Sequence, residues 1–470
     1  MQTPGDVGAC AKMFQALDQA VWTAGVWDAE DHRVTGFPYL RVDRALAAVD
    51  PAAVGVFDAW VDRMQALDRR GREVELANLA AVWTAGEADT VPSLAQVDEC
   101  RQVLRAVDLR DPGRHWQLLQ AAKVPDDYSL GKRIAGLYPL SSLFFKAGVA
   151  RLHERIRAEF SRPLDELPVR GELLRFGPPI TSPESIRVAA VLEATSRNPL
   201  RRPEPGPAQR RALFDAFAPA FEVDVAETDE RLGAPYWKDD ARAAVDIGRP
   251  TVYRRLSYMR FGAQTLLQLN YVIWFPSRPR TGVFDLLGGH MDGITWRVTL
   301  GTDGRPLAYD AMHNCGCYHM FFPASGLIPR PPSLERHEEP VLVAQTAPVG
   351  PGRLVIRLAH RTHYIQRIYR EVSVAADVPY VLDDYHRLRS LTLPAGGHRS
   401  LFGPTGIVAG TSRGERFFFW PMGIADPGAM RQWGRHAVSF VGRRHFDDAD
   451  LLARYFYTAR TKADDARTTR

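Results

Sequence analysis

The stretch from residue 288 to residue 322 constrains the fold more than any other part of the sequence. In its first half, apolar residues at 294, 296, 298 and 300 alternate with polar residues at 295, 297 and 299. This two-residue period is typical of a half-buried β-strand. Asp303-Gly304 follows and is typical of a type I′ turn, because both central positions of that turn require positive φ. The sequence therefore predicts a β-hairpin.

The turn fixes the register of this hairpin. With Asp303-Gly304 as the two loop residues, the predicted pairs are Leu300 with Leu307, Val298 with Tyr309, Ile294 with His313, Asp292 with Cys315 and His290 with Cys317. Directly opposed residues share a face of a sheet, so we expect six reactive side chains on one face. They are His290, Asp292, His313, Cys315, Cys317 and His319.

Such a cluster suits a transition metal, because imidazole, carboxylate and thiolate groups are the ordinary ligands of iron, copper and zinc. We take all six residues as candidate metal ligands, with His290, Asp292 and His319 as the first choice. The candidate catalytic residues are Asp292, Cys315, Cys317 and Tyr309, and Tyr309 and Asp310 are also placed to orient a ligand. The structural alternative is a pair of packed thiols or a Cys315–Cys317 disulfide among hydrogen-bonded core histidines.

A longer-range set of residues offers a second metal site. His290-x-Asp292, followed by His360 and Arg370, resembles the ligand order of iron and 2-oxoglutarate oxygenases. In that family two histidines and an aspartate hold the iron, and the arginine binds the cosubstrate carboxylate. His363 and Arg367 form a comparable pair. Cys315, Cys317 and the Asp-Gly turn are no part of the oxygenase pattern.

Composition and charge restrict the class of protein. The 470 residues are 45% hydrophobic and 24% charged, as in soluble globular proteins. No run of about 18 apolar residues occurs, so we expect no transmembrane helix. The net charge is +5, but the arginines are scattered among acidic residues, so we expect no nucleic-acid partner. The chain starts without an apolar signal segment, so we expect a cytoplasmic protein or a processed form.

Periodicity predicts an α+β protein, with a mostly helical N-terminal domain and a largely antiparallel, β-rich C-terminal domain. We place the helical domain at 1–165, a proline-rich mixed region at 166–250, and the β-rich domain with the metal site at 251–470. The expected helices include 54–83, the Ser93-capped helix after residue 93, 207–221 and the terminal 447–458. The expected strands include 251–261, 264–275, 353–370, 385–393, 405–412 and 415–422.

The two remaining cysteines, Cys10 and Cys100, each fall in a predicted helix. A Cys10–Cys100 bridge would need an oxidising compartment, and two buried thiols fit the sequence equally well.

The segments CAKMFQALDQAVWTAG…GFPYLRVDRALAA and GHMDGITWRVTL…YDAMHNCGCYHMFFP resemble an uncharacterised family of proteobacterial proteins with lipoprotein-type or secretory leaders. The resemblance covers most of the chain and carries no assigned activity. It implies the periplasm or cell envelope, a processed start and a lipid anchor in a precursor form. That location would make the Cys10–Cys100 bridge reasonable.

We therefore expect a metal-dependent enzyme of the envelope that acts on a small-molecule or envelope substrate. Iron or copper would make it an oxidoreductase, which mixed thiolate and imidazole ligation favours, and zinc would make it a hydrolase. The alternatives are the 2-oxoglutarate oxygenase and a non-catalytic envelope binding protein. In the latter, the Cys/His cluster is a disulfide or a structural metal site.

Overall fold

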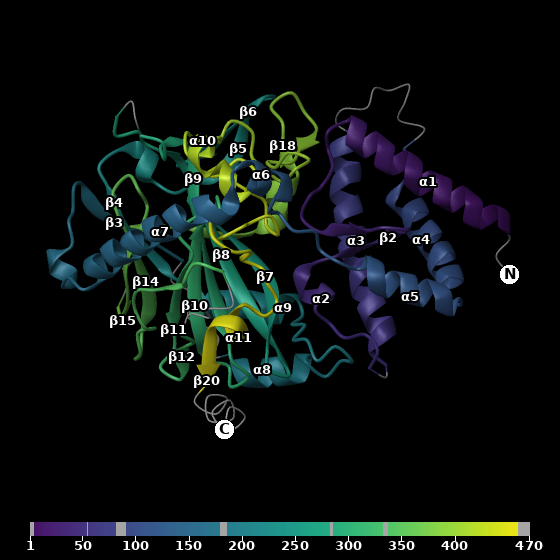
Figure 1. Cartoon of the computed structure of the whole chain (residues 1–470), viewed down its shortest axis with the longest axis horizontal. Helices are drawn as coiled ribbons and strands as arrows, with labels where there is room; N and C mark the ends of the chain where they lie inside the picture. The colour runs from purple at the N-terminus through teal and green to yellow at the C-terminus, as the bar shows by residue number, and fades with distance from the viewer. Residues whose placement is uncertain are drawn as a thin grey trace.

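The computed structural model in Figure 1 describes residues 4–53, 55–80, 91–178, 186–282, 285–331, 337–373 and 375–458. It is an α+β protein with 33% helix and 29% strand, which confirms the predicted fold class. Helices dominate the N-terminal part and strands the C-terminal part. Within the described ranges, no helix is both long and apolar enough to cross a membrane.

The N-terminal part packs helices around a short two-stranded sheet. Its elements are α1 (Pro4–Thr23), β1 (His32–Val34), β2 (Phe37–Val42), α2 (Arg44–Ala47), α3 (Val56–Leu79), α4 (Leu94–Asp108) and α5 (Pro112–Ala121). Ser93 caps α4 as predicted, and the cap is a full capping box with Gln96. Residues 54 and 81–83 of the expected 54–83 helix lie outside the described residues. A Cys10–Cys100 disulfide ties α1 to α4, which decides between the two cysteine alternatives.

A seven-stranded sheet forms the centre of the β-rich part, in the order β13-β11-β10-β9-β8-β7-β17. Its strands are β7 (Thr251–Phe261), β8 (Gln264–Arg278), β9 (Gly289–Leu300), β10 (Pro306–His313), β11 (Met320–Pro323), β13 (Leu342–Val343) and β17 (Val381–Asp384). The four long central strands are antiparallel. The short edge strands run parallel to their neighbours, β13 to β11 and β17 to β7.

A five-stranded sheet, in the order β15-β14-β4-β3-β16, packs against the first one. Its strands are β3 (Glu172–Gly177), β4 (Ala220–Val225), β14 (Arg353–Leu358), β15 (Ile365–Glu371) and β16 (Val378–Pro379). Trp296 and Val298 of β9 share a buried core with Phe221 of β4 and Ile356 of β14. The opposite face of β9 carries Arg297, which donates to the carbonyl of Phe446, so C-terminal segments cover that face.

Further elements surround the two sheets. The helices are α6 (Leu130–Ala135), α7 (Tyr138–Phe160), α8 (Val188–Thr195), α9 (Pro207–Phe217), α10 (Arg416–Phe419) and α11 (Leu451–Tyr455). The strands are β5 (Ala234–Asp239), β6 (Arg242–Asp246), β12 (Leu327–Pro329), β18 (Leu391–Thr392), β19 (His398–Arg399) and β20 (Phe456–Thr458), and the 3₁₀ turns include η4 (Tyr385–Arg389) and η5 (Trp420–Met422).

Several expected elements differ at their ends or in type. The hairpin formed by 251–261 and 264–275 is confirmed, with Phe261 opposite Gln264. Helix α9 stops at Phe217 rather than 221, because Pro219 disfavours helical geometry at the residue before it. The expected strand 415–422 is helical instead, as α10 and η5, since a short apolar run fits either structure. The terminal helix ends at Tyr455, and the last three residues of the expected helix form the strand β20 instead, which pairs with β12.

Candidate functional site

The central hairpin has the predicted register over most of its length. Val298 pairs with Tyr309 and Ile294 with His313, as the Asp303-Gly304 turn predicts. A bulge next to the turn brings Pro306, rather than Leu307, opposite Leu300. Strand β10 ends at His313. Residues 289–293 of β9 extend past this end and pair with β8 alone.

Asn314 ends the strand and builds the turn that follows. Its side-chain amide donates to the Ile273 carbonyl at 3.0 Å, and its side-chain oxygen accepts from the Thr295 hydroxyl at 2.8 Å. Gly316 sits in this turn with φ +95°, and a Cβ there would lie 2.6 Å from the Ala437 carbonyl oxygen. The chain therefore leaves β10 at Asn314.

The predicted pairs Asp292–Cys315 and His290–Cys317 are consequently wrong. Both cysteines lie in the turn between β10 and β11, not on β10, and both are free thiols. Strand β11 returns antiparallel with Met320 opposite Ala311, which puts His319 on the face opposite to His313. The expectation that all six reactive side chains share one face is therefore also wrong.

The six residues divide among separate environments. The Nε2 atom of His290 lies 2.9 Å from the carbonyl oxygen of Ala243. On the face of the sheet opposite to His313, Nε2 of His319 lies 3.0 Å from Asp310, which also binds Arg297. Across the described residues, no three His, Cys, Asp or Glu side chains are arranged to hold a metal ion. The metal prediction depended on these side chains lying close together on one face, and among the described residues they do not.

Asp292 is the centre of the one polar cluster that the hairpin does form. It is 1% exposed, and its carboxylate lies 2.8 Å from His363 Nδ1, 3.6 Å from His313 Nδ1 and 3.3 Å from a nitrogen of Arg413. Burial opposes ionisation, but Arg413 and the two histidines hold the pKa of Asp292 well below its usual value. The His363 ring stacks on Phe275 with centroids 3.8 Å apart. The cluster is thus rigid and ionic.

Strained backbone gathers around the same cluster. Met291, Tyr318, Arg361 and His363 all have φ between 50° and 58°, in the left-handed region. Each such residue costs about 1–3 kcal/mol and persists only where the surrounding structure enforces it. The hydroxyls of Tyr318 and Tyr364 are hydrogen-bonded to each other, and the adjoining cavity of about 20 Å³ holds little more than a water molecule. No substrate fits there.

The oxygenase constellation is not assembled around Asp292. His360 pairs with Glu230 at 2.5 Å instead, and Arg370 donates to the Tyr309 hydroxyl at 2.9 Å. His363, which the sequence offers as an alternative to His360, is the histidine that reaches Asp292. The distance between these residues in the sequence gives no sign of which histidine turns inward.

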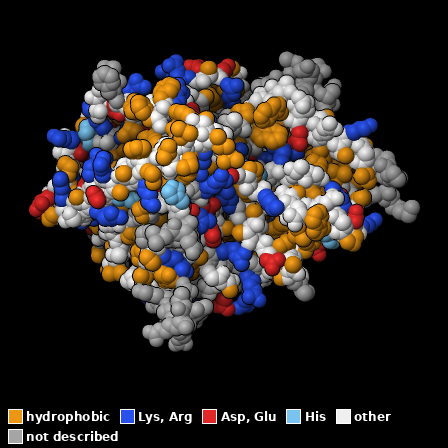
Figure 2. All heavy atoms as spheres, viewed as in Figure 1, with side chains coloured by type: hydrophobic (Ala, Val, Ile, Leu, Met, Phe, Trp, Pro, Cys, Tyr) orange, Lys and Arg blue, Asp and Glu red, His pale blue; other side chains and the backbone are white. Residues whose placement is uncertain are grey.

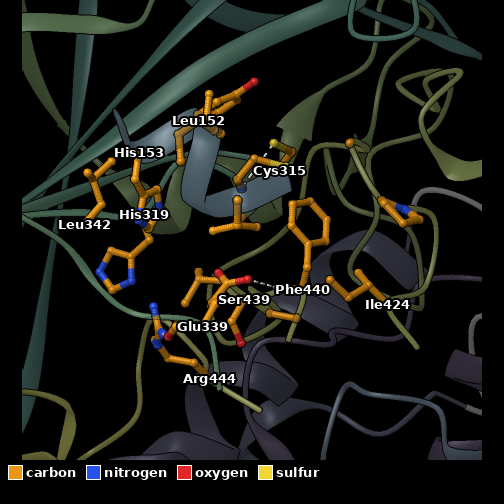
Figure 3. Close-up of a pocket in the computed structure, with 18 of the residues that line it drawn as sticks. Leu152, His153, Cys315, His319, Glu339, Leu342, Ile424, Ser439, Phe440 and Arg444 are labelled. Carbon is orange, nitrogen blue, oxygen red and sulfur yellow. Dashed lines mark hydrogen bonds between the residues drawn. The ribbon is translucent and has the colours of Figure 1, made fainter. Parts of the chain in front are cut away.

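Figure 3 shows a second small cavity, of about 50 Å³, beside the two thiols. Leu152 and His153 of α7 line it on one side, and Cys315, His319 and Arg444 are among the residues on the others. A hydrogen bond with Cys315 and burial raise the pKa of Cys317 well above its usual value. The Cys317 thiol is therefore protonated in this structure, which makes it a poor nucleophile.

A much larger hollow lies elsewhere, between the helical part and the β-rich part, and has a volume of about 710 Å³. Its lining residues come from α2, α3, α9 and β7, among other segments, and these four elements are labelled in Figure 1. Arginines dominate its lining: Arg44, Arg63, Arg69, Arg70, Arg202, Arg210, Arg211, Arg254 and Arg255. Only four carboxylates line it: Asp43, Glu204, Asp384 and Asp447. We call this hollow the arginine cleft.

Four arginines of the cleft lack a carboxylate within ion-pair distance among the described residues. They are Arg70 on α3, Arg210 and Arg211 on α9, and Arg254 on β7. The closely spaced positive charges affect the pKa of His386, which also lines the cleft. Burial, and then the guanidinium groups around it, hold the pKa of His386 well below its usual value. An anion in the cleft would relieve this repulsion.

Two buried carboxylates, Glu30 and Asp31, lie close to arginines of the cleft. Glu30 forms ion pairs with Arg255 and Arg389, and these arginines outweigh burial and lower its pKa. Asp31, next in the chain, has its pKa raised to about 7 by burial and by the charge of Glu30. The electrostatic potential of the cleft therefore depends on pH near neutrality.

Sequence reasoning missed the arginine cleft. Its arginines come from segments near residues 44, 63–70, 202–211 and 254, and each segment alone looks like an ordinary solvated surface. No protein-family model, curated protein or solved structure matches this chain. Membership of the resembled envelope family stays a prediction.

Proposed function

We propose that the protein binds a small, multiply charged anion, bearing phosphate or sulfate groups, in the arginine cleft. The observation that carries this proposal is the gathering of nine arginines around one hollow of about 710 Å³. That volume lies within the range of small-molecule sites, and domain boundaries are common places for them. Guanidinium groups bind phosphate and sulfate oxygens through paired hydrogen bonds.

Arginine placement supports a ligand that reaches both parts of the protein. Arg70 belongs to the helical part, whereas Arg211 and Arg254 belong to the β-rich part. A ligand with at least two anionic groups could bind both walls at once. Of the sequence-based hypotheses, a non-catalytic binding protein agrees best with this site. The Cys10–Cys100 disulfide supports an oxidising compartment such as the cell envelope.

Calorimetric titration with tripolyphosphate tests the proposal, and a sulfated disaccharide distinguishes phosphate from sulfate ligands. We expect Arg70→Gln combined with Arg211→Gln to weaken binding at least about tenfold, because each arginine lost removes a charge-assisted contact. Arg305→Gln, at an exposed turn outside the cleft, is the matched control. We also expect affinity to fall as salt rises from about 50 to 200 mM. Equal affinity in both variants would exclude the cleft as the binding site.

Metal analysis tests the metalloenzyme hypothesis separately. The protein is purified without chelator, and iron, copper and zinc are measured in wild type and in His290→Ala. Stoichiometric metal that disappears in His290→Ala would favour the hairpin site over the arrangement described above. A metal content that stays below stoichiometric amounts in both proteins would agree with the dispersed positions of His290, His319 and Asp292.

A further inference from the structure

Exposed hydrophobic side chains gather on one surface of the β-rich part. Leu130 and Ile134 of α6 are more than 60% exposed. On the adjoining first turns of α7, Leu140 and Leu143 are more than half exposed, and Phe144 is 80% exposed. Large hydrophobic side chains scattered singly are normal on a protein surface, but a contiguous group marks a binding surface.

The C-terminal segment around α10 extends this surface. Phe417 and Phe418 project into solvent, while Phe419 packs on Phe145 of α7 with ring centroids 5.5 Å apart. The partly exposed Trp420 begins η5, which packs against both α6 and α7. Figure 2 shows the hydrophobic side chains together over α6, α10 and the start of α7. Two segments about 280 residues apart thus build one patch.

The two segments that form the patch carry charges of one sign. The sequence has no Asp or Glu between residues 128 and 153, or between 416 and 425. The same segments carry the exposed basic residues Lys146 and Arg416 and the half-buried Lys132. Hydrophobic and aromatic side chains interspersed with basic residues are typical of proteins that lie on membranes with anionic lipids.

A strained residue joins the two helices of the patch. Leu137, between α6 and α7, has φ +48° and is 65% exposed. A leucine in the left-handed conformation is costly, and here its side chain gains no burial in return. The inner face of α7 is turned toward the rest of the protein, because Val149, Leu152 and His153 line the cavity beside the thiols. Only the outer face of its first turns is available for contact.

We propose that this patch, formed by α6, the start of α7 and α10, docks the protein onto the surface of a bilayer containing anionic phospholipid. The side chains of Phe144, Phe417 and Phe418 enter the boundary between head groups and acyl chains, and Lys132, Lys146 and Arg416 contact the phosphates. The protein then lies on the membrane without spanning it. The patch is separate from the arginine cleft and contains none of its lining residues.

Sedimentation with vesicles of phosphatidylglycerol and phosphatidylcholine tests this proposal. We expect wild type to bind mixed vesicles, and Phe144→Glu combined with Phe417→Glu to bind at least tenfold more weakly. Val372→Glu combined with Val381→Glu is the control, because both valines are exposed outside the patch. Circular dichroism of each variant confirms folding. The cleft variant Arg70→Gln with Arg211→Gln should still bind vesicles, which separates this proposal from anion binding in the cleft.

Tryptophan fluorescence gives a second readout that does not require the double variant. Lipid brominated on its acyl chains should quench wild type more than Trp420→Phe, since Trp420 lies in the patch. Equal vesicle binding by the patch variant and wild type would overturn the proposal. So would a patch-dependent dimer in sedimentation velocity with no vesicle binding, because it would make a second copy of the chain the occupant.

Discussion

His363 and Asp292 lie 71 residues apart in the sequence, yet Nδ1 of the first is 2.8 Å from a carboxylate oxygen of the second. His363 comes from the link between β14 and β15 of one sheet, and Asp292 from β9 of the other. The pair therefore joins the two sheets through a buried polar contact. Arg413 adds the C-terminal segment to the same carboxylate at 3.3 Å.

Asp292→Asn should destabilise the protein strongly. The substitution leaves Arg413 without its buried counter-charge, and breaking one partner of a buried ion pair costs about 3–5 kcal/mol. Urea unfolding followed by circular dichroism measures the change in the free energy of unfolding. Asp165→Asn, on an exposed turn, is the control and should change it by less than about 0.5 kcal/mol. A similar small change in Asp292→Asn would show that the cluster is not a structural centre.

The hairpin shows how much of the structure local sequence patterns can predict. The Asp303-Gly304 turn and the alternation of residues 294–300 are local signals, and beyond the bulge next to the turn they predicted the register correctly, from Val298–Tyr309 to Ile294–His313. The end of β10 depends on two long-range hydrogen bonds of Asn314, which no local pattern predicts. Its side-chain amide donates to the Ile273 carbonyl, and its backbone carbonyl accepts from the Arg431 amide. Extending the alternation beyond Asn314 therefore placed both cysteines on a strand that had already ended.

The arginine cleft and the hydrophobic patch were missed for a related reason. Each is assembled from segments that are distant in sequence, such as α6 with α10, and neither segment alone is unusual. The run 415–422 was expected to form a strand, which would have buried half of its aromatic side chains. Its helical geometry exposes Phe417 and Phe418 instead.

His319 should make the protein sensitive to acid. Burial lowers the pKa of His319 to about 4, so the unfolded chain takes up a proton near pH 6.5 that the folded protein refuses. Stability contributed by neutral His319 is thus complete above pH 6.5 and is lost as pH falls toward 4. Relative to His319→Gln, the free energy of unfolding of wild type should fall by about 1.4 kcal/mol per pH unit between 6 and 4.5.

Urea titrations of both proteins at several pH values measure this difference. Glutamine is uncharged and can still donate to Asp310, so the subtraction removes the contribution of the other titrating groups. A difference that stays constant from pH 7 to pH 4.5 would contradict the buried, neutral state of His319.

The Cys10–Cys100 disulfide should stabilise the helical part. It closes a loop between residues 90 apart in the sequence, and removing a native disulfide commonly costs about 2–5 kcal/mol. We expect Cys10→Ser with Cys100→Ser to lower the melting temperature, and dithiothreitol to lower that of wild type similarly. Cys315→Ser removes a free thiol and is the control for reductant effects. Identical melting of wild type with and without reductant would show that the bridge is not formed in solution.

Asp31 should tune anion binding in the arginine cleft. Its pKa is raised to about 7, first by burial and then by Glu30, so it gains a proton as pH falls from 8 to 6. Protonation removes a negative charge behind Arg70 and Arg255, which strengthens the positive potential available to a bound anion. Tripolyphosphate affinity should therefore rise as pH falls through 7, over and above the change caused by protonation of the ligand itself.

Asp31→Asn isolates the contribution of this carboxyl group, because asparagine imitates the protonated form at every pH. At pH 8 we expect the variant to bind tripolyphosphate several-fold more tightly than wild type, and at pH 6 equally well, since wild type is then protonated too. Calorimetry at both pH values with the same ligand cancels the ionisation of tripolyphosphate. An affinity ratio between variant and wild type that is the same at pH 6 and pH 8 would separate Asp31 from the cleft.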